Sequence, residues 1–233
     1  MKYSSWVLLL GVLLLTGCGV SRPVGSGICD CQQAVRVPDK AFRTFLLEKG
    51  YAEKAGWQKV RPTATGCALT TLECYSQGIH TLEGISMFPQ LVELTCSENP
   101  ITELDLGVLP HLERLYCLDV PLRKLNAGNR SHLKRVQLSY THLDTLDLAK
   151  MPDLELLLCI FSPLTAIDIT PCQQLRTLYI RGTQITEVDL SGNLMMHELH
   201  ALDTPLRTLT ITSKQYDGDV RASISDSVCI VVH

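Results

Sequence analysis

The 233-residue sequence has few aromatic residues, little net charge and no apolar run of the roughly 20 residues that a transmembrane helix needs. Aromatic residues make up 6% of the chain, and the formal net charge is −3. The basic residues are scattered along the sequence, whereas a nucleic-acid-binding protein carries them on one stripe. These features argue against a membrane-spanning protein and against a nucleic acid as the partner.

The sequence also lacks the motifs of catalytic and cofactor sites. His197-Glu198-Leu199-His200 differs by one residue from the zinc-protease pattern H-E-x-x-H, and it lies in a predicted strand rather than a helix. No phosphate loop, dinucleotide fingerprint or second cluster of metal-ligating residues is present. We therefore expect no catalytic residue, metal or cofactor. A hydrolase remains a third hypothesis, which loss of turnover in His200→Ala would support.

The chain does contain a 21-residue pattern that repeats six times without a gap between Leu91 and Ile211. Five columns of this pattern are apolar in all six units. A degenerate unit of 22 residues precedes them and begins at Leu69. A fixed period of this length predicts a solenoid, in which each unit buries its apolar face against its neighbours. The repeat domain is predicted to span residues 67–211, with about seven repeats.

The pattern L-x-x-L-x-C-x-x-(T/S/N)-x-L-x-x-L-D-L resembles the leucine-rich repeats, and in particular the short class with cysteine at position six. The resemblance implies an α/β-type solenoid, a right-handed coil with short parallel strands on its concave face and a small helical N-terminal cap. Only Asn99 keeps the asparagine column of the family. Hydroxyls replace it in four units and should also bond the turn, whereas Val120 cannot and predicts a looser turn.

The N-terminal residues predict a lipoprotein leader. Lys2 precedes an apolar segment, Trp6–Leu15, and Leu15-Thr16-Gly17-Cys18 resembles the bacterial lipobox. The resemblance implies that residues 1–17 are removed, that Cys18 is lipidated and that residues 18–28 form a flexible tether. The alternative is an ordinary secretory signal with a chance cysteine. We expect a lipid anchor in the bacterial cell envelope, with the outer membrane favoured because Gly19 is not aspartate.

Both ends of the repeat domain are predicted to be capped. Residues 29–66 form the N-terminal cap, and their segment 37–47 resembles the V-P-D-x-x-F-R-x-x-L-L cap of internalin-like proteins. Asp39 should cap a helix there, and Trp57 should plug the open end of the core. Residues 48–65 lack the spaced carboxylates of a calcium loop. Residues 212–233 form the C-terminal cap, with a closing strand at 227–232.

The strand of each unit should expose positions three, five and seven on the concave face, because side chains alternate across a strand. In the unit that begins at Leu154, all three of these positions are apolar. An apolar centre edged by Tyr and Arg is typical of protein-binding surfaces. The alternatives are a chance apolar run, or a surface covered by the cap or by a dimer partner. The candidate ligand-binding residues are Tyr116, Leu118, Arg114, Arg135, Leu156, Leu158, Ile160, Tyr179, Arg181 and Leu202.

Seven of the ten cysteines fall into two groups. Cys74, Cys96, Cys117 and Cys159 share an inward column, where they should be buried thiols used as small apolar residues. A metal or disulfide between Cys96 and Cys117 is conceivable, although parallel neighbours make poor disulfides. In the cap, one cysteine of the pair Cys29 or Cys31 is predicted to form a disulfide with Cys67. The aspartate of the L-D-L element should accept turn N–H groups.

Together these patterns predict a lipid-anchored cell-envelope protein that recognises another protein, or another macromolecule, through the concave face of a leucine-rich repeat solenoid. The identity of the partner does not follow from the sequence. The alternative is a structural or scaffold lipoprotein that associates with itself.

Overall fold

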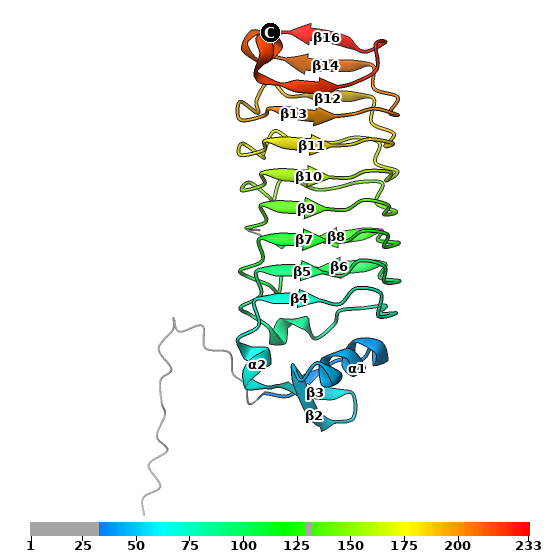
Figure 1. Cartoon of the computed structure of the whole chain (residues 1–233), viewed down its shortest axis with the longest axis vertical. Helices are drawn as coiled ribbons and strands as arrows, with labels where there is room; N and C mark the ends of the chain where they lie inside the picture. Colours follow the sequence, from blue (N-terminus) through cyan, green and yellow to red (C-terminus); the bar gives the residue numbers. More distant parts are fainter. Residues whose placement is uncertain (1–32, 129–131) are drawn as a thin grey trace, which may run out of the picture.

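The structure is a computed structural model that describes residues 33–128 and 132–233, apart from the side chain of Asp219. The described chain is a solenoid of stacked coils with a small domain at its N-terminal end (Figure 1). The signal segment, Cys18 and the tether all lie outside the described residues. Among the residues that are described, no helix is long and apolar enough to cross a membrane.

One strand from each coil joins a single parallel sheet, which we call the eight-stranded face after its described strands. Each strand is only three residues long, and its middle residue is apolar, the smallest being Ala222. Neighbouring strands pair 21 to 23 residues apart, and Leu72, Leu94 and Leu115, for example, lie in register. From the N-terminal side the strands are β4 (Thr71–Glu73), β5 (Glu93–Thr95), β7 (Arg114–Tyr116), β9 (Arg135–Gln137), β10 (Leu156–Leu158), β11 (Thr177–Tyr179), β13 (Glu198–His200) and β15 (Arg221–Ser223).

The opposite side of the coil carries two smaller parallel sheets that the sequence interpretation did not include. Apart from the last strand, which belongs to the C-terminal segment, their strands form at the L-D-L element, which was interpreted only as a turn. Its aspartates do accept turn N–H groups as expected; Asp105 Oδ1, for example, accepts from Gly107 N at 2.9 Å. The sheets are β6 (Glu103–Asp105) with β8 (Lys124–Asn126), and β12 (Glu187–Asp189) with β14 (Thr208–Ile211) and β16 (Cys229–Val232).

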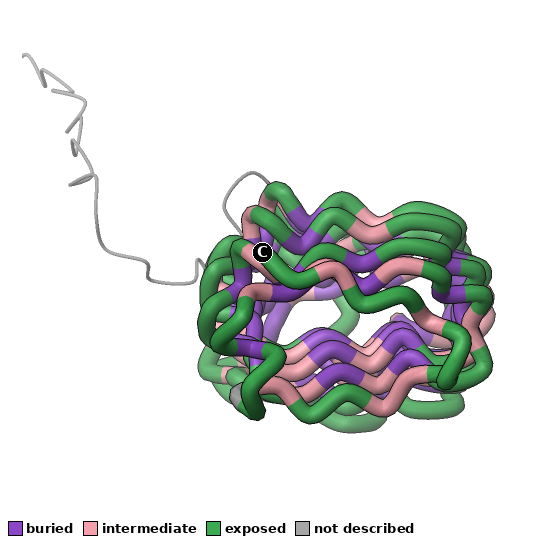
Figure 2. The backbone as a smooth tube through the Cα atoms, turned by 90° about the horizontal axis from the view of Figure 1, so that it is seen from above, coloured by how far each residue is buried: buried purple, intermediate pink, exposed green. Residues whose placement is uncertain are grey.

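The apolar columns of the repeat form one continuous core between the two sides of the coil. Figure 2 looks down the long axis and shows buried residues alternating with exposed ones around each turn. The second leucine of each unit, such as Leu94, Leu157 or Leu199, is fully buried. Each coil therefore buries its apolar side chains against the coils on either side, which is the source of stability in a solenoid.

Buried polar side chains hold the turns that connect the two sides. Asn99 donates to Cys74 O at 2.7 Å and accepts from the backbone N–H groups of Gln77 and Ile79 at 3.0 Å. In later coils a hydroxyl bonds a carbonyl three residues back, as Thr183 does with Ile180 at 2.7 Å. Val120 is buried at the same position and makes no such bond, yet its coil keeps the register of its neighbours.

The N-terminal cap contains more β-structure than the expected helical cap. Its helix α1 (Lys40–Glu48) begins after Asp39, whose Oδ1 accepts from Phe42 N at 2.8 Å, and it buries Phe42, Phe45 and Leu46 as predicted. A three-stranded antiparallel sheet accompanies the helix. The remaining elements of the cap and first repeat are β1 (Val35–Arg36), β2 (Ala52–Gly56), β3 (Lys59–Pro62), α2 (Ala64–Cys67) and the 3₁₀ helix η1 (Ile85–Met87).

Two expectations about the ends of the solenoid need correction. Trp57 does not plug the core, because its side chain is 83% exposed in the turn between β2 and β3. Phe88, which is fully buried, lies at this end instead. The C-terminal segment forms two strands rather than one, β15 and β16, with the π-helical turn η2 (Gln215–Asp219) before them. Of the described strands, β16 is the outermost in its sheet and is itself an open edge.

Candidate binding face

The strand register brings the predicted binding residues together at the middle of the eight-stranded face. Leu156 lies between Arg135 and Thr177 on the neighbouring strands. Leu158 lies between Gln137 and Tyr179, and Tyr116 is the next residue beyond Gln137. The predicted residues therefore extend across five consecutive strands, β7, β9, β10, β11 and β13.

The residues just after the strands continue this surface. Tyr140 N donates to Ile160 O, Phe161 N donates to Arg181 O, and Gly182 N donates to Leu202 O. This ladder holds the backbones of Ile160, Arg181 and Leu202 side by side. In the same column, however, Ser97 and Ser139 are buried, so the expectation that the whole column faces outward was wrong at these two positions. The small serine side chains at these two positions lie buried between the larger residues of adjacent coils.

The apolar centre of this surface is accessible. Leu156, Leu158 and Ile160 are half-buried, as are Tyr116 and Tyr179, whereas the leucines between them are fully buried. The N-terminal cap lies at the end of the solenoid and leaves the middle of the eight-stranded face uncovered (Figure 1). We call the surface formed by Tyr116, Leu118, Leu156, Leu158, Ile160 and Tyr179 the central patch.

The three predicted arginines differ in their pairing. Arg114 Nε lies 2.5 Å from Glu93 Oε2, and the Arg181 guanidinium lies 2.7 Å from Asp203 Oδ2. Arg135 is exposed next to Leu156, and it forms no ion pair within the described part of the chain. Of the three, Arg135 is thus the cation whose charge is open to a partner.

A polar cluster borders the central patch toward the C-terminal end. Glu198 Oε1 accepts from the Tyr179 hydroxyl at 3.2 Å and lies 2.9 Å from His200 Nε2. The Tyr179 and His200 rings stack with centroids 4.1 Å apart. The bond to His200, followed by that to Tyr179, lowers the pKa of Glu198 below its ordinary value. His197 bonds Met195 O instead, so the two histidines do not converge as they would in a zinc protease.

Two aromatic residues on the rim of this face were missed in the sequence. Tyr140 and Phe161 are 50% and 42% exposed, and their ring centroids lie 5.2 Å apart. The Arg181 guanidinium lies 5.7 Å from the centre of the Phe161 ring. Both aromatics occupy position eight of the repeat, immediately after the columns that were read from the sequence. The sequence could have revealed them, because the other units carry Ser, Glu, Asp or Gly at this position.

The backbone at position eight is left-handed in all seven repeats. The φ angles are 56° at Tyr140 and 53° at Phe161, and 70° at the equivalent Gly182. Aspartate and glycine adopt this conformation most readily, whereas a bulky aromatic residue does so at a cost of about 1–2 kcal/mol. The remaining members of the column are Ser76, Glu98, Asp119 and Asp203. Tyr140 and Phe161 therefore occupy positions where the backbone favours smaller residues.

A column of thiols supports the face from inside. Cys74, Cys96, Cys117 and Cys159 are fully buried, as predicted, and none is in a disulfide. Cys96 Sγ and Cys117 Sγ lie 2.8 Å apart. Burial raises the pKa of the Cys159 thiol to about 12, so it is neutral at physiological pH. Within the described residues, no group of three or more His, Cys, Asp or Glu side chains could hold a metal ion.

The remaining cysteines separate by location. Cys172 is buried in the turn on the far side, where its thiol donates to Met151 O at 3.4 Å, and Cys229 is exposed on β16. Cys67 is disulfide-bonded. Its two alternative predicted partners, Cys29 and Cys31, lie outside the described residues, as does the lipidation residue Cys18. The pairing and the lipidation therefore stay predictions.

Comparisons with known proteins identify the fold. No family sequence model and no curated protein matches the chain. Among solved structures, internalin C2 from Listeria monocytogenes is 19% identical with a TM-score of 0.54, over 81% of this chain and 94% of its own. Human 5T4, the trophoblast glycoprotein, is 14% identical with a TM-score of 0.53, over 76% and 79% of the two chains.

A third similar structure is that of TLR13 in complex with a single-stranded RNA. It is 18% identical with a TM-score of 0.53, over 71% of this chain and 30% of TLR13. At these identities the likeness shows the fold alone. The chain is a leucine-rich repeat solenoid, and its structural neighbours include internalin-type proteins.

Proposed function

We propose that this protein binds a partner protein through the central patch of its eight-stranded face and does so while anchored to the bacterial cell envelope by a lipid on Cys18. The anchoring rests on the lipobox-like sequence. The binding function rests on the composition and accessibility of the face. It is a binding role rather than a catalytic one: Ser223 lies across from His200 on β15, but His200 Nε2 pairs with Glu198 and no side-chain hydrogen bond joins His200 to Ser223 in the described chain.

The observation that carries the proposal is the run of three outward-facing apolar residues on β10 and just after it. Leu156, Leu158 and Ile160 occupy columns that are mostly polar on the other strands. A repeat that needed only to fold would gain nothing from these three side chains, because the core columns are already filled. An accessible apolar centre with tyrosines beside it and arginines at its edge has the composition of an energetic hot spot.

The test is capture of the partner from envelope or host extract with the wild-type protein and the variant Leu158→Asp. A charge placed at the centre of a hot spot should weaken binding by at least about 2 kcal/mol, or roughly 30-fold, so that one band is lost. The matched control is Leu194→Asp. Leu194 is 73% exposed in a turn away from the face, so this variant should capture the same band as the wild type.

A second pair of variants separates binding from folding. Arg135→Glu reverses an exposed charge beside Leu156 and should weaken capture by roughly tenfold, whereas Arg123→Glu, exposed on the other side of the coil, should not. Equal capture by all four variants would contradict the proposal. If the protein instead sediments as a dimer that Leu158→Asp dissociates, the central patch serves self-association, and the scaffold hypothesis replaces recognition of another protein.

The anchor is tested separately by Cys18→Ser. A lipobox serine cannot receive a thioether-linked diacylglycerol, so the protein should move from the membrane fraction to the soluble fraction. Metabolic labelling with a radioactive fatty acid should mark the wild type and leave the variant unlabelled. Unchanged labelling of the variant would exclude Cys18 as the lipid-bearing residue.

A further inference from the structure

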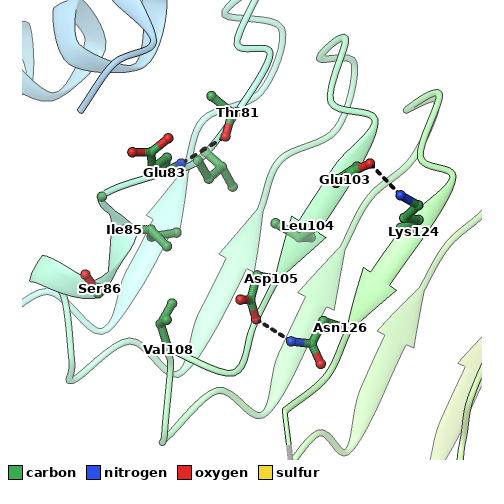
Figure 3. Close-up of a pocket in the computed structure, with 12 residues that line it drawn as sticks. Thr81, Glu83, Ile85, Ser86, Glu103, Leu104, Asp105, Val108, Lys124 and Asn126 are labelled. Carbon is green, nitrogen blue, oxygen red and sulfur yellow. Dashed lines mark hydrogen bonds and ion pairs between the residues drawn. The ribbon is translucent and has the colours of Figure 1, made fainter. Parts of the chain in front are cut away.

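A second candidate site lies on the opposite side of the coil, between the first repeat and strand β6. Here the first repeat leaves the pattern of its successors, because Gly84 adopts a φ of 99° and the chain turns into the 3₁₀ helix η1. Residues 81–86 therefore do not pair with β6. The gap between them is a groove of about 570 Å³ (Figure 3).

Glycine at position 84 is required by the cap. A Cβ atom there would lie 2.6 Å from Arg36 O and 2.7 Å from a Val37 methyl group, because strand β1 of the cap passes directly behind it. The Arg36 side chain continues across this contact to form an ion pair with Glu83 at 3.2 Å. The cap thus holds the wall of the groove in its unpaired position.

The groove exposes the free backbone edge of β6. Leu106 N donates to Asn126 O and Lys124 N donates to Thr102 O, so the even-numbered residues face β8. Successive residues of a strand direct their backbone groups to opposite sides, so the N–H and C=O groups of Glu103 and Asp105 face the groove. In the described chain no backbone hydrogen bond joins either residue to residues 81–86. Two donors and two acceptors are therefore available to an added strand.

The lining combines an apolar floor with an excess of negative charge. Leu82, Ile85 and Leu104 form the floor, and Val108, 43% exposed, lies at one end. Glu83, Glu103 and Asp105 contribute three carboxylates against two cations, Lys124, which pairs with Glu103 at 2.9 Å, and Arg36, which pairs with Glu83 at 3.2 Å. Figure 3 shows Glu103 and Asp105 directed toward β8, next to the groove.

From this arrangement we infer that the groove binds an extended peptide bearing lysine or arginine, which adds to β6 as a short strand. Backbone hydrogen bonds to Glu103 and Asp105 supply affinity for an extended chain, and the carboxylates select cationic side chains. An apolar side chain of the peptide, placed between two of its cationic side chains, would contact the groove floor at Leu82 and Leu104. The site lies on the other side of the coil from the central patch, so the two can be occupied independently.

Strand β12 provides an internal comparison. It has the same Glu-x-Asp sequence, Glu187 to Asp189, and it too is an edge strand among those described. Its groove is smaller, about 420 Å³, and the preceding coil lines it with Thr165, Ala166 and Ile167. Asp168 is the residue of that coil at the position of Glu83, but it does not line this groove, and its Oδ1 accepts from Thr170 N at 3.0 Å. The inference therefore applies to β6 and not to β12.

The experiment measures amide hydrogen exchange of the full-length protein in detergent, with and without the blocked peptide Lys-Val-Lys-Val-Lys. Exchange at Glu103 and Asp105 should slow by roughly tenfold or more at saturation, while Glu187 and Asp189 stay unchanged. The peptide Glu-Val-Glu-Val-Glu should have no effect. Lys-Pro-Lys-Pro-Lys keeps the charge but has no N–H at its two proline positions and does not form a regular strand ladder, so it should not slow exchange either.

Two matched variants test the charge. Asp105→Lys and Asp147→Lys each lose a turn bond to the N–H two residues on, but only Asp105 lines the groove. Affinity for the lysine peptide should fall roughly fivefold or more with Asp105→Lys and change less than about twofold with Asp147→Lys. Absence of protection at β6, equal protection by the proline peptide, or protection at β12 instead would overturn the inference.

Discussion

At the scale of single residues, the repeat fixes most side chains and leaves a few that it does not explain. The leucines, the column cysteines and the L-D-L aspartates all fill the core or bond a turn. Tyr140 and Phe161 instead occupy left-handed positions that suit neither residue. Gly182 completes this arrangement, because its lack of a side chain leaves room for the Phe161 ring.

This role of Gly182 leads to a stability prediction. A Cβ at Gly182 would lie 2.3 Å from the Phe161 ring, and the residue has a φ of 70°. Gly182→Ala should therefore lower the free energy of unfolding by about 1–3 kcal/mol, measured by urea denaturation. Gly192→Ala is the control, since nothing lies within 4 Å of its Cβ, and it should change stability by less than about 0.5 kcal/mol. Equal changes in the free energy of unfolding of the two variants would show that the position of the Phe161 ring does not depend on Gly182.

At the scale of elements, the cap and the first coil are joined by few polar contacts. Asp39 contributes to them through Oδ2, which accepts from His80 N of the first repeat at 2.9 Å, while its Oδ1 caps helix α1 at Phe42 N. One carboxylate therefore both starts the helix and ties it to the solenoid. Its two oxygens cannot be replaced by a single hydroxyl.

We expect Asp39→Ala to destabilise the protein by about 2 kcal/mol, because both a helix cap and a bond between elements are lost. Hydrogen exchange should accelerate in α1 and β4, while β11, which lies five strands along the sheet from β4, should keep its wild-type rate. Asp39→Asn, which retains an acceptor for Phe42 N, should have a smaller effect. A uniform acceleration in all coils would mean that the cap and repeats unfold as one unit.

How far the sequence predicted these elements depended on periodicity. The 21-residue spacing predicted seven of the eight strands of this face, their register and the position of Leu156, Leu158 and Ile160, whereas β15 lies after the last repeat and was not predicted. The hairpin of β2 and β3 was missed because Glu53, Lys54 and Lys59 give it no apolar alternation. Trp57 was misplaced for the same reason, since an unpatterned segment gives no indication of which side faces the core. The groove at β6 arises from a break in the period, which periodicity alone does not describe.

At the scale of the whole molecule, the buried thiols link stability to pH. Burial raises the pKa of Cys172 to about 11 and of Cys159 to about 12, and it also raises that of Cys74. An unfolded thiol titrates near pH 8.5, so the unfolded chain loses its protons first as the pH rises. The stabilisation is thus complete below about pH 8.5 and is lost progressively toward pH 11 and 12.

The urea midpoint of the wild type should therefore fall between pH 8 and pH 10, and the fall should be smaller in Cys159→Ala. Each such thiol contributes a slope of about 1.4 kcal/mol per pH unit in this range. The variant will be less stable at every pH, so the comparison concerns the pH dependence and not the absolute value. Identical pH profiles would show that Cys159 titrates alike in the folded and unfolded chains.

The pairing of each strand only with its immediate neighbours also determines how mechanical load would travel. If the protein is held at its N-terminal end and a partner pulls on β10, tension passes through the cap and through strands β4, β5, β7 and β9. The coils from β11 onward carry none of it. Under sustained pulling, the contact of Asp39 with His80 and that of Arg36 with Glu83 are in series with the bound partner. The strength of the cap therefore limits the force that this binding face can withstand.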